Sequence, residues 1–537
     1  MSLFFGSLYE SSLNTMGGSF DSHAIRGMAC AALAAGLHYW ATQPASGAGW
    51  CLVALVPLMA AARWDAADAA APDASIAAGA IRRSVATGAL YGLLLTVAAI
   101  YWAVPLLPTV YGFGALKTLG VAVAFTLFAT AAYLMLYLAM VRAACVGWAP
   151  SLTGGPFLVC LELVYPRMPP QYLGASLVPA TAWVQMADLG GPLLLTLWVG
   201  LVNGLVLEVG TALARRRAVA PLHIGLAALL LGAPALYGAH RMRAVEEELA
   251  ARPTLRVGIV QPDRPMYVGD DDVEPIYAAL REGTRRVLAR GPIDLVLWPE
   301  GAPPDAVSPD LATVTPWLPE GLGGAALLFG ATTEPADDPG GPRRASAFLA
   351  GPDGHIAARY DKIALFPFGE YVPFGDRFPG LYDFFGVEEK RPGVASPVLV
   401  DGSLRLGVLI CYEDLLPAFV RLRVLPGNPG LLVNLTNDGW FFETPGAAIH
   451  MRLARLRAVE HHRYLVRATN HGISGVVDPL GRLVRAAPPF EPATLVAEVT
   501  PLDGTTLYAR LGDWPGWAAL LSAPWMLVGR GRRRQAG

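Results

Sequence analysis

The sequence predicts a bundle of eight transmembrane α-helices joined to an α/β domain that lies outside the cytoplasm. The chain has 537 residues, of which 54% are hydrophobic and 16% charged, and its mean hydropathy is +0.42. This composition is far more apolar than that of an ordinary soluble domain. The apolar runs lie before residue 240 and after residue 513. Between them, short β-rich runs alternate with polar helical ones, which is the pattern of an α/β domain.

Each predicted transmembrane segment is an apolar run of about 15 to 25 residues, long enough to cross a bilayer as a helix. Seven of them precede the α/β domain, at residues 25–41, 49–63, 84–107, 118–141, 149–165, 188–212 and 221–239. The eighth is WPGWAALLSAPWMLVG, which is followed by the basic sequence RGRRRQAG. We therefore divide the chain into a membrane domain (1–243), an α/β domain (244–510) and a C-terminal helix with a cytoplasmic tail (511–537). The first span is expected to be an uncleaved anchor, because residues 1–20 contain no basic segment of a signal peptide.

The distribution of Lys and Arg predicts the orientation, because positively charged short loops stay in the cytoplasm. If the N-terminus is cytoplasmic, the outside loops carry only Lys117 and Arg167. The inside loops and tail then carry Arg63, Arg82, Arg83, Arg142, Arg215, Arg216, Arg217, Arg530, Arg532, Arg533 and Arg534. With seven spans before it, the α/β domain lies outside the cytoplasm.

The charge balance and the cysteines narrow the function. The net charge is −2, so the chain has no electrostatic footprint for nucleic acid, and no zinc-type cysteine spacing or glycine-rich phosphate loop occurs. Four cysteines lie in or beside apolar segments, where a thiol is usually a small buried hydrophobe: Cys30, Cys51, Cys145 and Cys160. Only Cys411 belongs to polar sequence. It has no disulfide partner in its own domain, which favours a chemical role over an inert packed thiol.

Three stretches of the α/β domain share one form, a β-rich apolar run that ends in a reactive group. IDLVLWPEGAPP ends at Glu300, ARYDKIALFPFGEYVPF presents Lys362 and Glu370, and LGVLICYEDLLP ends at Cys411. Residues just past strand ends are where the sites of α/β sheets assemble. Taken singly, a glutamate here could cap a helix and a lysine could form a surface ion pair.

In this order and with these neighbours, Glu300, Lys362 and Cys411 resemble the Glu-Lys-Cys triad of the nitrilase superfamily. Similar stretches follow in LVNLTNDGWF and RLRAVEHHRYLVRATNHGISGVVDPLGRL, and the resemblance covers about residues 254–500. It implies an αββα sandwich. With seven apolar spans before this domain and one after it, the whole chain resembles the apolipoprotein N-acyltransferase family, multi-pass enzymes of the bacterial inner membrane with a periplasmic catalytic domain.

The resemblance implies a role for each candidate residue. A free thiol with a pKa of about 8.5 is only a few per cent ionised at neutral pH, so Glu300 acts as the general base that takes the proton of Cys411. Lys362 helps to stabilise the oxyanion. Glu370, Tyr412 and Glu413 support the site, with ordinary ion pairs and packing as the alternative. Since side chains alternate along a strand, we expect Tyr412 to turn away and Glu413 to return toward the site.

The reaction implied by the resemblance is a two-stage acyl transfer. A phospholipid such as phosphatidylethanolamine gives its sn-1 acyl chain to Cys411, and the thioester then acylates the N-terminal diacylglyceryl-cysteine of an apolipoprotein. No metal or organic cofactor is needed, and we expect a monomer. Two alternatives stay open: a membrane-tethered nitrilase or amidase that hydrolyses a small C–N substrate, and a transporter or receptor whose outer domain only binds a ligand.

The stretch LFPFGEYVPFGDRFPGLYDFFG, residues 365–386, holds eight Phe or Tyr residues among Gly and Pro. Such a run can neither form a regular helix nor bury all its rings in one small loop. We predict a mobile arm that rests in the membrane interface, where amphipathic rings are favoured, with Phe374 and Phe378 touching lipid. Trp440 is a candidate second flap. A loop packed into the core is the alternative.

Two further features require an interpretation. A Cys–His pair is a rival constellation, because four histidines follow Cys411: His450, His461, His462 and His471. We rank it low, since the Arg and Glu spacing of AIHMRLARLRAVEHHRYLVRA favours a solvated helix face with i,i+4 pairs.

Glu162 lies within the fifth span, where a carboxylate is costly and often functional. A paired or neutral carboxylate is the alternative.

Overall fold

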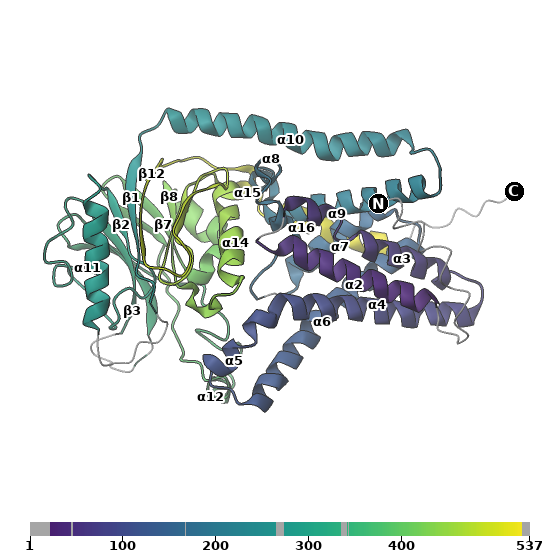
Figure 1. Cartoon of the computed structure of the whole chain (residues 1–537), viewed down its shortest axis with the longest axis horizontal. Helices are drawn as coiled ribbons and strands as arrows, with labels where there is room; N and C mark the ends of the chain where they lie inside the picture. The colour runs from purple at the N-terminus through teal and green to yellow at the C-terminus, as the bar shows by residue number, and fades with distance from the viewer. Residues whose placement is uncertain are drawn as a thin grey trace.

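The computed structural model describes residues 22–44, 47–166, 168–264, 273–334, 341 and 343–528. It has a bundle of helices at one end and two β-sheets at the other (Figure 1). Residues 1–21, Arg167 and the basic tail from residue 529 onward, all of which entered the sequence argument, lie outside the described residues.

The chain before the sheets is helical, and every predicted span in it coincides with helical residues. The long helices are α2 (Ser22–Thr42), α3 (Val56–Ala69), α4 (Ala74–Ile100), α6 (Ala115–Cys145), α7 (Pro150–Val164), α9 (Ala187–Ala214) and α10 (Pro221–Ala250). Shorter turns connect them: η1 (Ala48–Leu52), η2 (Tyr101–Ala103), α5 (Leu106–Thr109), η3 (Leu173–Leu177) and α8 (Thr181–Val184). After the sheets, α16 (Trp514–Val528) returns to pack on α7 and α9.

Five helical stretches of the described chain are long and apolar enough to cross a membrane. They are Ala48–Ala69, Ala74–Thr109, Ala115–Cys145, Ala187–Ala214 and Pro221–Ala250. Helix α7 is apolar but has only 15 residues, or about 22 Å at 1.5 Å per residue, against a hydrocarbon core of about 30 Å. Helices α2 and α16 do not reach the same length and hydropathy. The helices are therefore those of a membrane protein, but their length and composition do not establish eight spans.

Small residues bring the two central helices into backbone contact. A Cβ atom on Gly200 of α9 would lie 2.2 Å from the Cα atom of Gly155 in α7, and one on Gly204 would lie 2.3 Å from the Cα atom of Ser151. Helices within a bilayer have no hydrophobic driving force toward each other, so close approach through small side chains is a main source of their cohesion. Glu162, also on α7, is buried, and its Oε1 accepts the backbone N–H of Leu173 at 2.9 Å. It therefore has a hydrogen-bond donor inside the bundle.

The α/β region contains two six-stranded sheets. The first has the order β12-β1-β2-β3-β4-β5 and the second the order β11-β10-β9-β8-β7-β6. The strands of the first are β1 (Leu255–Gln261), β2 (Leu295–Leu297), β3 (Ala326–Thr333), β4 (Arg344–Ala350), β5 (Ile356–Asp361) and β12 (Ala493–Val499). Those of the second are β6 (Val398–Asp401), β7 (Leu404–Ile410), β8 (Leu431–Thr436), β9 (Leu465–Thr469), β10 (Gly475–Val477) and β11 (Leu483–Ala486). Strands β1, β2 and β3 pair in parallel in the first sheet, and β7, β8 and β9 pair in parallel in the second. Glu300 follows β2 and Cys411 follows β7, so both residues follow strands of these parallel sets.

The sheets pack face to face with a helix on each outer face. Alternate side chains such as Ile259, Leu297, Val408 and Val433 form one apolar core between the sheets. Helix α11 (Glu274–Leu288) covers the outer face of the first sheet, and α14 (Gly446–His461) covers the outer face of the second (Figure 1). This is the four-layered arrangement predicted from the resemblance.

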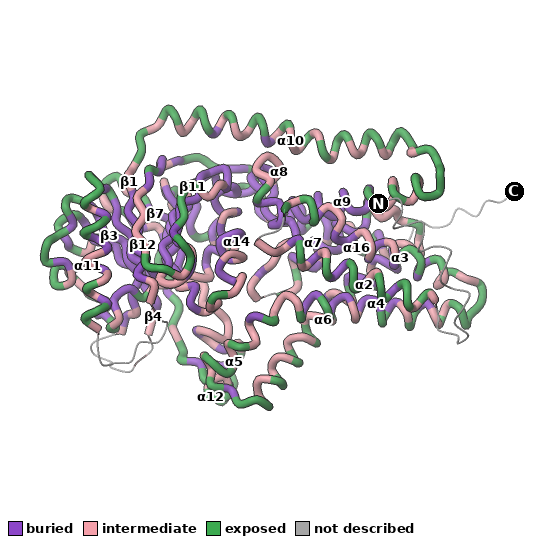
Figure 2. The backbone as a smooth tube through the Cα atoms, in the orientation of Figure 1, coloured by how far each residue is buried: buried purple, intermediate pink, exposed green. Residues whose placement is uncertain are grey.

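Helix α14 also forms the junction with the membrane helices. Met451, Ala454 and Ala458 pack on the second sheet, whereas Leu453 and Leu456 pack into the core of the helical bundle. The prediction of a solvated face for this helix is therefore wrong, and Figure 2 shows α14 buried along most of its length. Two of its charged residues, Arg457 and Glu460, form a buried ion pair with each other at 2.5 Å.

Candidate active site

Cys411 occupies the first position of a tight turn at the end of β7. The strand ends at Ile410, the 3₁₀ turn η4 runs over Cys411–Leu415, and Cys411 has a φ of +50°. A non-glycine residue with positive φ is strained, and such residues cluster at functional sites. Because the chain turns here, the strand alternation that we used for Tyr412 and Glu413 does not apply.

Lys362 lies between two carboxylates. It follows β5 directly, and its side chain is 1% exposed. Its Nζ lies 2.7 Å from Oε2 of Glu370 and 3.9 Å from Oε1 of Glu300. Glu370 has a second cation in Lys390, whose Nζ lies 3.4 Å from Oε1, and it accepts the backbone N–H of Phe366 at 2.8 Å. The structure thus brings together Glu300, Lys362 and Glu370, which sequence analysis took from separate stretches.

The charges of these groups act on one another and on Cys411. Burial and then the charge of Glu300 raise the pKa of the Cys411 thiol to about 12, and Lys362 opposes them. Burial also raises the pKa of Glu300, with Lys362 opposing. Burial alone would lower the pKa of Lys362, but the negative charges of its neighbours, Glu370 first, outweigh it and raise that pKa. The site therefore holds a charged lysine beside a neutral thiol that needs a base.

Glu413 ties the Cys411 turn to the segment that carries Lys362. Its Oε1 accepts the Tyr360 hydroxyl at 2.6 Å and the backbone N–H groups of Ile363 and Ala364 at 2.9 and 3.0 Å. Its Oε2 accepts the N–H of Ile410 at 2.8 Å. Burial raises the pKa of Glu413 to about 7, and its hydrogen-bond donors oppose the shift. Glu413 thus joins the ends of β7 and β5, and Tyr412 lies with its ring 5.2 Å from that of Phe366, an edge-to-face pair.

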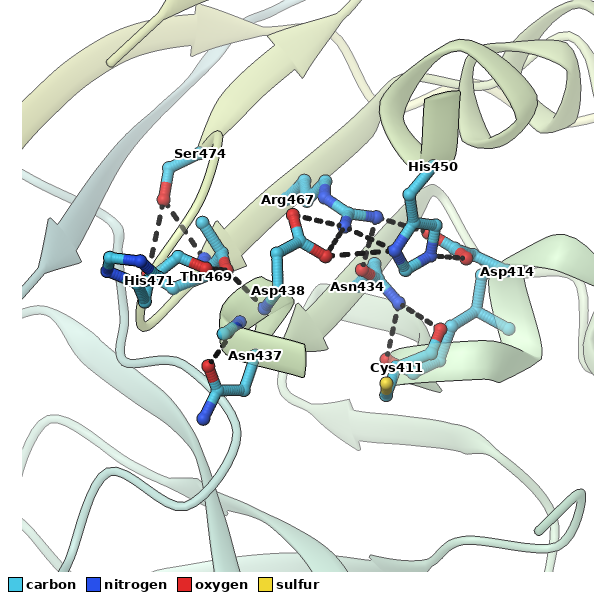
Figure 3. A network of polar contacts seen from close by, with 12 residues as sticks. Cys411, Asp414, Asn434, Asn437, Asp438, His450, Arg467, Thr469, His471 and Ser474 are labelled. Carbon is cyan, nitrogen blue, oxygen red and sulfur yellow. Dashed lines mark hydrogen bonds and ion pairs between the residues drawn. The ribbon is translucent and has the colours of Figure 1, made fainter. Parts of the chain in front are cut away.

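A buried ionic network lies on the other side of the Cys411 turn (Figure 3). Arg467 of β9 donates to Asp414 at 2.7 Å and to Asp438 at 2.7 Å. The two ring nitrogens of His450 face the same carboxylates, Nε2 at 2.7 Å from Asp414 and Nδ1 at 2.9 Å from Asp438. Burial and Arg467 would lower the pKa of His450, but both carboxylates raise it. Two cations and two anions then balance each other inside the protein.

Asn434 connects this network to the nucleophile. Its Oδ1 accepts from Arg467 at 3.1 Å, and its Nδ2 donates to the backbone carbonyl of Cys411 at 3.1 Å. In Figure 3 the sulfur of Cys411 lies on the side of its residue away from His450. The network therefore fixes the backbone of the turn and leaves the thiol to the opposite side.

The aromatic stretch 365–386 lies along the helical region. Phe374 is 78% exposed and Phe378 is 56% exposed. The segment contains the short helix α12 (Gly380–Phe385), and Phe385 packs against Phe368 and against Phe113, which precedes α6. The segment is thus anchored at its end, whereas the two phenylalanines predicted to touch lipid are free of the core. Trp440 is half-buried in the turn η7 (Asp438–Phe441).

Comparisons with known proteins identify the family of the chain. Residues 256–506 match the carbon-nitrogen hydrolase family. The chain is 31% identical over 374 residues to the apolipoprotein N-acyltransferase of Rhodopseudomonas palustris, covering 66% of this chain and 67% of that protein. This chain belongs to the apolipoprotein N-acyltransferase family.

Other members of the apolipoprotein N-acyltransferase family match less of their length. The Geobacter metallireducens protein is 32% identical over 63% of this chain and 66% of its own length, and the Azotobacter vinelandii protein is 35% identical over 46% and 48%. The matches thus span about half to two thirds of these relatives. Among solved structures, Saccharomyces cerevisiae Nit3, a member of branch 10 of the nitrilase superfamily, covers 46% of this chain and 90% of its own at 19% identity and a TM-score of 0.38. That likeness is too distant to support a role for any residue.

The histidines after Cys411 have other partners. His450 belongs to the ionic network, and His471 Nδ1 lies 2.6 Å from Asp263. His462 Nδ1 lies 3.0 Å from Arg241 of α10, and the His461 ring packs 5.7 Å from that of Tyr508. Within the described ranges, no hydrogen bond or ion pair joins a histidine to Cys411, and no cluster of three or more His, Cys, Asp or Glu could hold a metal ion.

Proposed function

We propose that this chain transfers an acyl group from a phospholipid to the N-terminal diacylglyceryl-cysteine of apolipoproteins, through a thioester on Cys411. One observation supports this most strongly. A strained strand-end cysteine shares a buried site with Lys362, which lies 3.9 Å from Glu300 and 2.7 Å from Glu370, in a domain that packs directly on apolar helices. A buried nucleophile beside a membrane suits an acyl donor that is itself a lipid.

In the first half-reaction, Glu300 takes the thiol proton as the sulfur attacks the carbonyl carbon of the donor ester. The negative charge that develops on the carbonyl oxygen is stabilised by Lys362 and by a backbone N–H near Cys411. When the tetrahedral intermediate collapses, the C–O bond of the ester breaks and Glu300 returns the proton to the departing oxygen. A lysophospholipid leaves, and the acyl group stays on the sulfur.

In the second half-reaction, the α-amino group of the apolipoprotein attacks the thioester carbonyl. Glu300 accepts a proton from the amine and delivers it to the leaving sulfur, as microscopic reversibility requires. The amide product and the free thiol result, so no metal or organic cofactor enters the cycle. Confinement of both substrates to one membrane raises their effective concentration at the site.

Glu370 and Glu413 act through other residues. Glu370 holds Lys362 between two carboxylates, and Lys390 shares the charge of Glu370. Glu413 connects Ile410, which precedes Cys411, to Ile363, which follows Lys362. We propose that these two glutamates hold the Lys362 ammonium group and the Cys411 sulfur in fixed positions relative to each other, while Tyr412 packs beside them.

The topology that suits this function has eight membrane spans. Residues 1–243 form seven of them, residues 244–510 form the periplasmic catalytic domain, and residues 511–537 add the last span and a cytoplasmic tail. The location is the bacterial inner membrane, and the working unit is a monomer. Cysteine-accessibility labelling of Arg215→Cys and Asp353→Cys in intact and in permeabilised cells tests the orientation. The first is expected to react only after permeabilisation, and the second in both.

We also propose that Phe374 and Phe378 contact lipid at the membrane surface and that Trp440 shields the site from water. Replacing both phenylalanines by serine removes exposed rings, so the free energy of unfolding should stay within about 0.5 kcal/mol of the wild-type value. Acyl-enzyme formation from phospholipid vesicles should fall. Unchanged acylation together with unchanged binding to the vesicles would remove the arm from the mechanism.

Mass spectrometry of the purified protein mixed with phospholipid tests the function directly. We expect an acyl adduct on Cys411 that hydroxylamine removes and that a diacylglyceryl lipopeptide discharges as an amide. Absence of the adduct would contradict the acyl-transfer mechanism. An adduct that only water discharges would favour the hydrolytic alternative, and full function of Cys411→Ser would favour the ligand-binding one.

A further inference from the structure

A second buried cation lies where the catalytic domain meets the membrane helices. Arg452 projects from α14 toward α2, and it is 6% exposed. Within the described part of the chain, its guanidinium donates to two backbone carbonyls, from NH1 to Ala41 at 3.4 Å and from NH2 to Gln43 at 2.5 Å. None of the described carboxylates lies within ion-pair distance of it. Burial lowers the pKa of Arg452 to about 10, and the positive charge of Arg455 adds to the effect.

The guanidinium lines a cavity whose wall contains both polar and apolar residues. The cavity is small, with a volume of about 30 Å³, and it opens to the outside; its polar lining residues are Thr42, Gln43, Gln171, Tyr172, Ser176 and Arg452. Ser176 is 2% exposed, and its hydroxyl makes no hydrogen bond with any described residue. Among the residues that the structure describes, the buried hydroxyl thus has no hydrogen-bond partner and the buried cation no counter-ion.

Burial of Arg452 and Ser176 without an anion or a hydrogen-bond partner among the described residues destabilises the fold. A buried cation without an anion carries a desolvation penalty that two carbonyl contacts offset only in part. Arg has five N–H donors in a planar fork that matches a phosphate or carboxylate, and only two of them donate to the carbonyls. An anion in the cavity would accept from the remaining donors and from Ser176, so it would remove both penalties at once.

The position of the cavity indicates where the anion comes from. Helix α2 ends at Thr42 and α4 at Ile100, and both helices reach the cavity at these ends, through Thr42 and Ala99. Beside them, Trp40 is 47% exposed and Tyr101 is 51% exposed. Exposed Trp and Tyr at helix ends mark the headgroup level of a bilayer. The abundant anion at that depth is the phosphate of a phospholipid.

We propose that this cavity binds the phosphate group of a membrane phospholipid, with Arg452 as the cationic partner and Ser176 as a neutral donor. The site is separate from the Glu300–Lys362–Cys411 site, and its existence does not depend on the acyl-transfer proposal. Ile449 and Leu453, which line the cavity, and Tyr412 and Leu415, beside Cys411, all pack in or against the apolar core of the helical bundle.

Lipid titration of the full-length protein in detergent tests the proposal. The probe is a diether phosphatidylglycerol, which has no ester to transfer, so acyl-transfer activity has no influence on the result. We expect native mass spectrometry to show a bound lipid on the wild type, and Arg452→Gln to weaken its binding at least about tenfold, as expected for loss of charge-assisted hydrogen bonds. Arg452→Lys should bind with intermediate affinity.

Arg455→Gln is the matched control. It removes the same charge one turn along α14, where Nε of Arg455 donates to the Gly481 carbonyl at 2.7 Å, and it should bind the lipid as the wild type does. The wild type alone gives a second measurement: the diether phospholipid should raise its unfolding temperature, and the dialkylglycerol with the same chains but no phosphate should not. Equal binding by Arg452→Gln and the wild type would overturn the proposal. So would equal effects of the two lipids, or saturation of the site by inorganic phosphate at the same concentration as the lipid.

Discussion

Replacement of Glu413 by glutamine tests the central structural argument, because four donors converge on this one buried carboxylate. Glutamine keeps the shape but has a single acceptor oxygen. If that oxygen faces Tyr360, Ile363 and Ala364, the new NH₂ group faces the N–H of Ile410, which now lies 2.8 Å from an acceptor. If the amide is turned the other way, the NH₂ group faces the donors that now lie 2.6 to 3.0 Å away. Either orientation leaves at least one buried donor unsatisfied.

The expected cost follows from this count. An unsatisfied buried N–H costs about 1–3 kcal/mol, and the remaining bonds lose the strength that an ionised acceptor gives them. We expect a loss of about 2–4 kcal/mol, which lowers the unfolding temperature by about 4–8 °C for a domain of this size. Tryptophan fluorescence during heating in detergent at pH 8 measures it. Acyl-enzyme formation should fall in parallel, because Glu413 joins the segments that carry Lys362 and Cys411.

Glu388→Gln is the control for this experiment. Glu388 forms an exposed ion pair with Arg343 at 3.4 Å, with side-chain exposures of 64% and 41%, and surface pairs of this kind contribute little. Its unfolding temperature should stay within about 1 °C of the wild type. If Glu413→Gln proves as stable as the wild type, or more stable, then desolvation of the charge outweighs its four hydrogen bonds and our assignment of its role is refuted.

The other predictions concern charge. Glu300→Gln should slow acylation by about 10²-fold or more. It should also lower the pKa of the Cys411 thiol below about 12, because the charge of Glu300 helps to raise that pKa. The rate of alkylation by iodoacetamide as a function of pH measures the thiol pKa, and an unchanged value would contradict the effect assigned to the charge of Glu300. Glu370→Gln removes the largest attraction on Lys362 and lowers the pKa of Lys362. Acylation by this variant should therefore decline as pH rises, whereas the wild type keeps its charged lysine. Identical pH–rate profiles of the two proteins above neutral pH would refute this role of Glu370. His450→Gln should cost about 3–5 kcal/mol, because two carboxylates remain with one cation. The folded-state pKa of His450 is raised, so its contribution to stability is complete below about pH 6.5 and is lost as pH rises through the raised value; unfolding temperatures of the variant should lack this alkaline decline.

Much of the site was predictable because its residues stand at the ends of apolar runs. Glu300, Lys362 and Cys411 each follow a strand, and the structure brings Lys362 near Glu300 as the motif order implied. The directions of Tyr412 and Glu413 were not predictable from strand alternation, because Cys411 adopts a positive φ and begins a 3₁₀ turn. A turn of this kind depends on contacts from other segments, here those of Glu413.

The ionic network behind Cys411 escaped the sequence analysis, although a signal for it exists. Arg467 stands inside the apolar strand sequence LVRAT, and Asn434 inside LLVNLT. A charged residue within a buried strand requires a buried counter-charge, and two such charges follow nearby strands at Asp414 and Asp438. The environment of α14 could not be predicted in the same way, because much of its burial comes from α9 and α2. Both helices lie more than 200 residues away in sequence, as the contact of Arg452 with Ala41 illustrates.

The shared position of α14 has a practical consequence for anyone who wishes to isolate the catalytic half. A fragment cut after α10 would keep both sheets but would expose Leu453, Leu456 and Val459, which now pack against the helical bundle. The same cut would deprive His462 of Arg241 on α10. A water-soluble enzyme therefore cannot be obtained by truncation alone, because the apolar face of α14 would first have to be redesigned with polar residues.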